Sequence, residues 1–135
     1  MEHVVREIDL SDYKWFVFGL LFFAALIDWY VRRAKIRLPA RAAHWAEALG
    51  VAAPRVLICE PKKRRGSCHP SGVVRLNWRI VQAPPRGVDY VVAHEVCHLI
   101  HQGHGRAFWA TLGRVMPDYE ARRARLKELG ARLAW

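Results

Sequence analysis

The chain is poor in the residues that would cross-link a small secreted domain. Its three cysteines, Cys59, Cys68 and Cys97, are an odd number at no disulfide-like spacing. Disulfide frameworks use paired cysteines in an oxidising compartment, so we interpret these three as reduced thiols of a cytosolic domain. The 135 residues, 53% of them hydrophobic, suffice for one domain with a modest core.

Acidic residues are also scarce, with 12 Asp and Glu against 22 Lys and Arg, and the formal net charge is +10. Clustered cations attract polyanions such as nucleic acid, anionic lipid or acidic substrates. Aromatic residues do not interleave with the C-terminal cations, as a base-stacking surface would require. A solvated helix face is therefore the simpler interpretation of that stretch, while the other basic runs lie at residues 32–41 and 62–65.

A cleavable signal peptide is not indicated, because the residues before the first apolar run are more acidic than basic and no small-x-small site follows it. The run itself, residues 15–27, has no charge, and it reaches seventeen residues at Val31 by including Asp28. A helix that spans a bilayer needs about 20 apolar residues, with roughly 17 as the lower limit. A membrane anchor over residues 15–31 and a helix buried within the domain are therefore both open.

The cations that follow this run bear on localisation. Arg32, Arg33 and Lys35 come directly after it. By the positive-inside rule, a spanning segment would leave the rest of the chain in the cytoplasm, and a buried helix would also leave it there. We expect an N-terminal apolar segment over residues 1–35 and one catalytic domain over residues 36–135.

Apolar periodicity and turn residues predict the remaining elements. Strands are expected over residues 54–60 and 73–81, paired as an antiparallel hairpin across a basic loop at 61–72. Four helices are expected: residues 39–51 with Pro39 in the first turn, 90–101 capped by Asp89, 106–115, and 117 to about 130. The fold class is α+β, with a small sheet packed on the helix at 90–101.

That helix contains the sequence H-E-x-x-H. His94 and His98 are four residues apart, so their imidazoles leave the same helix face and can hold one ion. Glu95 lies about 100° further round the helix and can reach a water on that ion without displacing it. Zinc lowers the pKa of such a water to about 7, which suits Glu95 to act as general base in hydrolysis.

A catalytic zinc site needs a third protein ligand from another direction. His101 continues the same helix face, whereas His104 lies between Gly103 and Gly105, which allow the chain to reverse after the helix. His104 is therefore the better third ligand, and His101 is interpreted as a group beside the ligands or a helix-end cation. A solvated helix end with four histidines is the alternative, but Val91, Val92 and their apolar neighbours indicate that this helix is buried.

These residues also match a family. From about residue 41 to residue 133 the chain resembles the YgjP-like metallopeptidases, a zincin-like group related to the SprT-like proteins. The resemblance is carried by "RRGSCHPSGVVRLNWRIVQAPPRGVDYVVAHEVCHLIHQGHGRAFW" and then "MPDY". It implies one zinc ion bound by His94, His98 and His104, with Glu95 as general base. Arg65 stands where the family usually has tryptophan, and the apolar segment replaces the family's longer β-rich N-terminal region.

Three further residues are candidates for supporting roles. Tyr119 or Arg106 could stabilise an oxyanion, and Asn77 could bond toward the metal helix or end a face of the hairpin. The sequence thus predicts a zinc metallopeptidase that cleaves peptide or protein substrates. The alternative is a basic nucleic-acid-associated binding protein with a structural zinc, and a basic protease acting near DNA or an anionic membrane surface combines the two.

Overall fold

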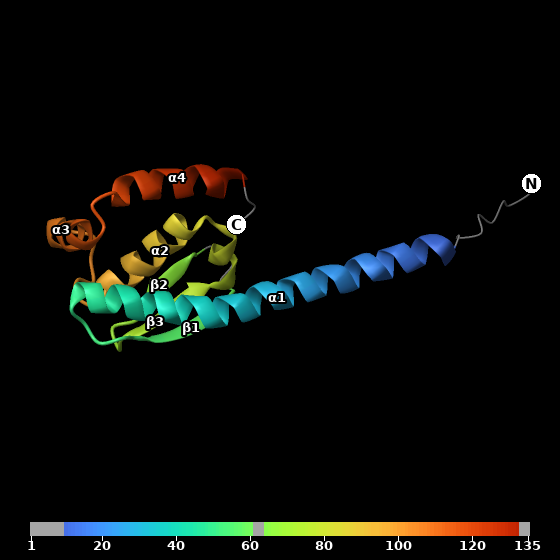
Figure 1. Cartoon of the computed structure of the whole chain (residues 1–135), viewed down its shortest axis with the longest axis horizontal. Helices are drawn as coiled ribbons and strands as arrows, with labels where there is room; N and C mark the ends of the chain where they lie inside the picture. Colours follow the sequence, from blue (N-terminus) through green and yellow to red (C-terminus); the bar gives the residue numbers. More distant parts are fainter. Residues whose placement is uncertain (1–9, 61–63, 133–135) are drawn as a thin grey trace, which may run out of the picture.

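The protein is described here by a computed structural model, which describes residues 10–60 and 64–132. Four α-helices and a three-stranded sheet make up this part of the chain, as Figure 1 shows, and the predicted α+β class is confirmed. The elements in chain order are α1 (Leu10–Leu49), β1 (Arg55–Cys59), β2 (Gly66–Cys68), β3 (Val73–Asn77), the 3-10 helix η1 (Trp78–Gln82), α2 (Pro85–Cys97), α3 (Arg106–Val115) and α4 (Tyr119–Arg132).

The sheet has the strand order β1-β3-β2, and the predicted hairpin between residues 54–60 and 73–81 is wrong. β1 pairs with β3 in parallel, with Arg55 opposite Val73. The antiparallel partner of β3 is β2, which lies within the predicted loop and places Gly66 opposite Leu76. The physical reason is a tight turn before β3, where Gly72 adopts a φ of 88° that favours glycine.

β3 ends at Asn77, four residues earlier than predicted. The Asn77 side chain accepts a hydrogen bond from the Arg79 backbone N–H at 2.9 Å and so caps η1. Its Nδ2 donates to the Arg64 carbonyl at 3.2 Å. The apolar residues Trp78 and Ile80 that suggested a longer strand are buried from η1 instead.

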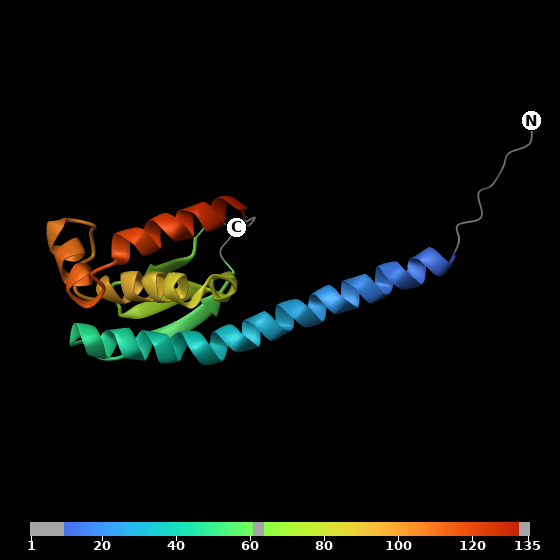
Figure 2. The same cartoon turned by 45° about the horizontal axis from the view of Figure 1, so that its top comes forward.

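α1 is one helix of 40 residues, so the short helix predicted to begin at Pro39 is wrong. Pro39 lies inside the helix, where its ring and missing N–H disturb the preceding turn. Figure 2 shows α1 bending near the point where it joins the domain, as expected beside a proline. Its second half packs into the core with one face, made of Ala34, Leu38, Ala42, Trp45, Ala46 and Leu49.

α2 begins at Pro85 and ends at Cys97, so Asp89 lies within the helix and does not cap it. Its carboxylate accepts two hydrogen bonds from the Arg41 guanidinium, at 2.7 and 3.0 Å. This bidentate pair is partly buried and ties α1 to α2. Proline suits the first helical turn because the N–H it lacks has no partner within the helix there.

The core surrounds α2, whose Val88, Val92 and Val96 are almost fully buried. Phe108 of α3 and Leu126 of α4 are buried against it from the other side. The predicted helices at 106–115 and from 117 onward correspond to α3 and α4, and the strand at 54–60 corresponds to β1. The end of α2 and the start of α3 therefore meet above the packed core.

The Arg41–Asp89 pair gives a stability prediction. A double-mutant cycle with Arg41→Ala and Asp89→Ala is expected to show a coupling of about 1–2 kcal/mol in urea unfolding, because two charge-assisted hydrogen bonds are lost together. The exposed Arg125–Glu128 pair at 3.0 Å is the matched control and should couple by less than about 0.5 kcal/mol. Equal couplings in the two cycles would contradict the role assigned to Arg41.

Candidate metal centre

Three histidines converge where α2 gives way to α3. His94 lies in the last turn of α2, His98 is its C-terminal cap, and His104 lies just before α3. The Nε2 atom of His104 is 3.0 Å from Nε2 of His98 and 3.0 Å from Nε2 of His94. One nitrogen from each ring therefore lies within 4.8 Å of the others, so the structure brings together the three predicted ligands.

The chemistry of these nitrogens fits a metal cation. His98 Nδ1 lies 2.9 Å from the His101 carbonyl oxygen, which can only accept, so Nδ1 carries the proton and the lone pair of Nε2 faces the other rings. Burial, followed by the charges of His98 and His104, lowers the pKa of His94 to about 4. Burial also lowers the pKa of His104. Three imidazole nitrogens that face one point are the donor set expected for a divalent transition metal.

Aromatic side chains of α3 hold the three rings in place. Phe108 is fully buried, and its ring centroid lies 4.6 Å from His98 and 5.0 Å from both His94 and His104. Trp109 donates a hydrogen bond from Nε1 to the His104 carbonyl at 3.1 Å. Phe108 is thus a core residue beneath the rings, and Trp109 fixes the loop that carries the third histidine.

The glycines around His104 act differently from the prediction. Neither Gly103 nor Gly105 has a positive φ, and Gly105 is extended with ψ near 180°. A side chain at either position would meet nothing within 4 Å. The chain therefore reverses by ending α2 in a turn, and the Trp109 bond holds His104 without any left-handed glycine conformation.

Glu95 is buried beside the three histidines, with 9% of its surface exposed. Burial raises the pKa of its carboxyl group from 4.5 to about 7. Gly66 of β2 packs directly against it, since a Cβ at residue 66 would lie 2.9 Å from Glu95 Cγ. Sequence reasoning missed this role of Gly66, because the close approach depends on how β2 packs on α2.

His101 lies apart from the convergent nitrogens. Its Nε2 is 2.9 Å from the Thr111 hydroxyl, and its carbonyl is the partner of His98. Its backbone carbonyl thus positions the His98 ring, and the supporting role predicted for its imidazole stays a prediction. Asn77 caps η1 and donates from its side chain to the Arg64 carbonyl just before β2, so it ties the end of β3 to the neighbouring strand.

Tyr119 and Arg106 are predicted as groups that could stabilise an oxyanion at the metal centre, and within the described part of the chain neither forms a hydrogen bond with the three histidine rings. The Tyr119 ring stacks on Trp109 with centroids 5.3 Å apart, and its hydroxyl donates to Glu120 at 3.4 Å. Arg106 is exposed at the start of α3. A tyrosine that the sequence did not single out is closer: the Tyr90 hydroxyl is 3.5 Å from His94 Nδ1, one helical turn before it.

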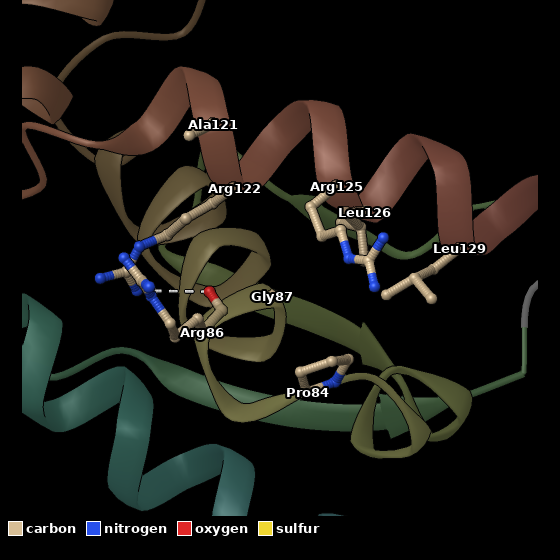
Figure 3. A pocket seen from close by; sticks show the side chains of 8 residues that line it. All are labelled: Pro84, Arg86, Gly87, Ala121, Arg122, Arg125, Leu126 and Leu129. Atoms are coloured by element: carbon tan, nitrogen blue, oxygen red, sulfur yellow. Dashed lines mark hydrogen bonds between the residues drawn. The ribbon is translucent and has the colours of Figure 1, made fainter.

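A cavity of about 280 Å³ lies away from this centre, between α4 and the first turn of α2 (Figure 3). Arg86 and Arg122 both bond the Asp118 carboxylate, and Arg122 also donates to the Arg86 carbonyl at 3.3 Å. Arg125 pairs with Glu128. Arg86 and Arg122 stabilise the packing of α4 on α2, and Leu126 lies against Gly87.

Comparison with known proteins agrees with this geometry. Residues 22–129 match the family described as YgjP-like, metallopeptidase domain. The chain belongs to the YgjP-like metallopeptidase family. The predicted resemblance is thereby confirmed, and with it a metal-dependent peptidase as the general activity. A comparison with curated protein sequences gives no significant match.

Among solved structures, the fold is similar to that of the metallopeptidase zymogen abylysin from Pyrococcus abyssi. The TM-score is 0.61 at 21% sequence identity, over 66% of this chain and 90% of that chain. The family match begins within α1, which is continuous across residue 35. The predicted boundary between an N-terminal segment, residues 1–35, and a catalytic domain, residues 36–135, stays a prediction. Residues 1–9 and 133–135 of these two ranges lie outside the described residues.

The burial of Glu95 predicts a pH-dependent stability of the metal-free protein. A carboxyl group whose folded pKa is raised binds its proton more tightly in the folded state, so stability falls as the pH rises from about 4.5 to about 7. Glu95→Gln removes this loss, and the variant should gain about 3 kcal/mol relative to the wild type between pH 4.5 and pH 8. Urea unfolding with a chelator at both pH values tests this, with exposed Glu47→Gln as control; a constant difference would contradict it.

Proposed function

We propose that the protein is a zinc-dependent peptidase that binds one zinc ion through His94, His98 and His104 and uses Glu95 as general base. The observation that carries the proposal is the convergence of three Nε2 atoms beside a buried carboxylate. Imidazole nitrogen is a ligand that zinc commonly takes in enzymes.

The number of ligands favours a catalytic ion over a structural one. Structural zinc sites have four protein ligands, whereas catalytic sites have three and leave a position for water or substrate. Within residues 10–60 and 64–132, the group contains three residues, and His101 is engaged with Thr111. His104 is exposed, so the centre is open to solvent on that side.

The chain's own residues have separate tasks in hydrolysis. When bound, zinc would supply a Lewis acid and lower the pKa of a water molecule. Glu95, with its pKa near 7, can accept a proton at neutral pH and return it to the leaving amine. Gly66 leaves the space that the Glu95 side chain occupies, and the His101 carbonyl keeps the His98 ring in the ligating tautomer.

The surroundings of the centre suit an extended peptide. β2 is an edge strand, and an edge strand offers backbone groups to which a peptide can add as a further strand. A depression of about 250 Å³ opens beside His98 and Gln102 and is lined on the other side by Cys68, His69 and Pro70. We infer that the substrate lies along β2, with a side chain in this depression and its scissile bond next to Glu95.

Replacing Glu95 separates metal binding from catalysis. Glu95→Gln should keep one zinc per chain and reduce hydrolysis of an unfolded protein by at least about 100-fold, because the general base is lost and the ligands are not. Elemental analysis and cleavage assays on the same sample measure both quantities. Glu47→Gln, an exposed glutamate on α1, should leave both unchanged; wild-type hydrolysis by Glu95→Gln would exclude it as the base.

Replacing histidines identifies the ligands. His104→Ala should lower the zinc content far below one per chain, since it removes one of three ligating nitrogens. His101→Ala should retain about one zinc per chain, because it removes the ring that bonds Thr111 and leaves the backbone carbonyl that supports His98. Zinc titration with a competing chelator gives both results, and the opposite order would assign the third ligand to His101.

A further inference from the structure

The first half of α1 projects away from the domain as an isolated helix (Figures 1 and 2). An 18-residue window of this helix has a mean hydropathy of 1.6, and none of it is buried. Large apolar side chains are exposed at successive positions, so they cover the whole circumference. They are Tyr13, Trp15, Phe16, Phe18, Leu20, Leu21, Phe22, Phe23, Leu26, Ile27 and Trp29. An apolar surface of this extent needs a partner.

The dimensions of the segment match a bilayer. The 19 residues from Tyr13 to Val31 extend about 29 Å as a helix, and the hydrocarbon core of a bilayer is about 30 Å thick. The charged residues within the segment, Lys14 and Asp28, lie near its two ends, and Asp28 is paired with Arg32 at 2.8 Å. Tyr and Trp occur at both ends, as they do at the two interfaces of membrane helices.

The distribution of apolar residues distinguishes spanning from surface binding. A helix that lies in the interface has one polar face, whereas this segment is apolar on every side. It does not fold back on the domain either. The first contacts with the domain are made by Tyr30, which stacks on Trp78 at 6.2 Å, and by Val31, which packs against the core.

The end of the domain at which the helix leaves is basic. Arg32, Arg33 and Lys35 follow the apolar segment, and Arg33 lies over the Trp29 ring at 5.3 Å. Arg79 lies over the Trp78 ring at 4.9 Å but is paired with Glu60, so the cations that follow the apolar segment carry the charge of this end. Such cations are attracted to the anionic headgroups of a cytoplasmic leaflet, and the positive-inside rule places the domain on that side.

The fold fixes the distance between the metal centre and the end of the apolar segment of α1. α2 lies against α1 and runs in the same direction (Figures 1 and 2), and the Arg41–Asp89 bonds set the two helices level. Ten residues separate Val31 from Arg41, and five separate Asp89 from His94. At 1.5 Å per residue, the centre lies about 20 Å beyond the end of the apolar segment.

We propose that residues 13–31 span an anionic lipid bilayer and that the continuous α1 holds the metal centre about 20 Å beyond the cytoplasmic edge of the hydrocarbon core. The substrates would then be cytoplasmic segments of neighbouring membrane proteins, whose peptide bonds the centre cleaves. This substrate class rests on the proposed peptidase function. An extended chain covers at most about 3.5 Å per residue, so the cleaved bond lies about six or more residues from the substrate's own membrane segment.

Reconstitution tests the spanning segment without requiring activity. The full chain is mixed with vesicles of phosphatidylcholine and phosphatidylglycerol, floated, and washed with alkaline carbonate. The wild type should stay with the vesicles, and Leu20→Arg combined with Phe23→Arg should reduce the retained fraction at least tenfold, because two charges lie at the centre of the span. Ile36→Arg is the matched control, since Ile36 is a 78% exposed apolar residue of the same helix outside the segment.

Other outcomes of this experiment overturn the proposal. Release of the wild type by carbonate would mean peripheral binding, and a water-soluble oligomer that ignores vesicles would mean that another copy covers the segment. Helix content by circular dichroism and zinc content should be equal in all variants, because the substituted side chains contact nothing in the domain.

Tethered peptides test the height of the centre. Wild-type protein in the same vesicles is mixed with one of two lipid-anchored peptides. Both peptides carry the same cleavable sequence, placed three residues from the anchor in one and twelve residues in the other. The longer tether should be cut at least tenfold faster, and equal rates would overturn the fixed height. If neither tethered nor free peptide is cut while the flotation result holds, the proposed peptidase function fails and the membrane segment stands.

Discussion

Burial of α2 is the constraint on which the rest of the structure depends. α1, β2, β3, η1, α3 and α4 all contact this helix, and its valines fill the centre of the core. A helix enclosed in this way can carry polar side chains only where each has a partner or a function. His94 and Glu95 are such side chains, and the elements that enclose α2 also place the loop of His104 and the edge strand beside them.

Local spacing made the centre predictable from the sequence. The H-E-x-x-H pattern needs only the helical repeat, and His104 follows from the need for a ligand outside that helix face. The same holds for β1 and α3, whose bounds depend on short apolar runs and on nearby glycine and proline. The prediction about Gly103 and Gly105 was wrong in its reason, because Trp109, five residues beyond His104, holds that loop through a backbone hydrogen bond.

Features that depend on contacts between distant residues could not be predicted. The parallel pairing of β1 and β3 follows from β2, which is three residues long and too short to show a period. Asn77 ends β3 because its side chain finds the Arg79 N–H and the Arg64 carbonyl, and apolar alternation continued past it. α1 passes through Pro39 because the buried face on either side of it continues without a break.

The contact between Gly66 and Glu95 also makes the sheet edge part of the catalytic apparatus in a mechanical sense. A Cβ at residue 66 would lie 2.9 Å from Glu95 Cγ, so any side chain at this position of β2 would displace the glutamate. A peptide that lengthens the sheet at β2 would stiffen this short strand and so hold the Glu95 side chain in one position. Occupancy of the edge and the position of Glu95 are then coupled through a single residue without a side chain.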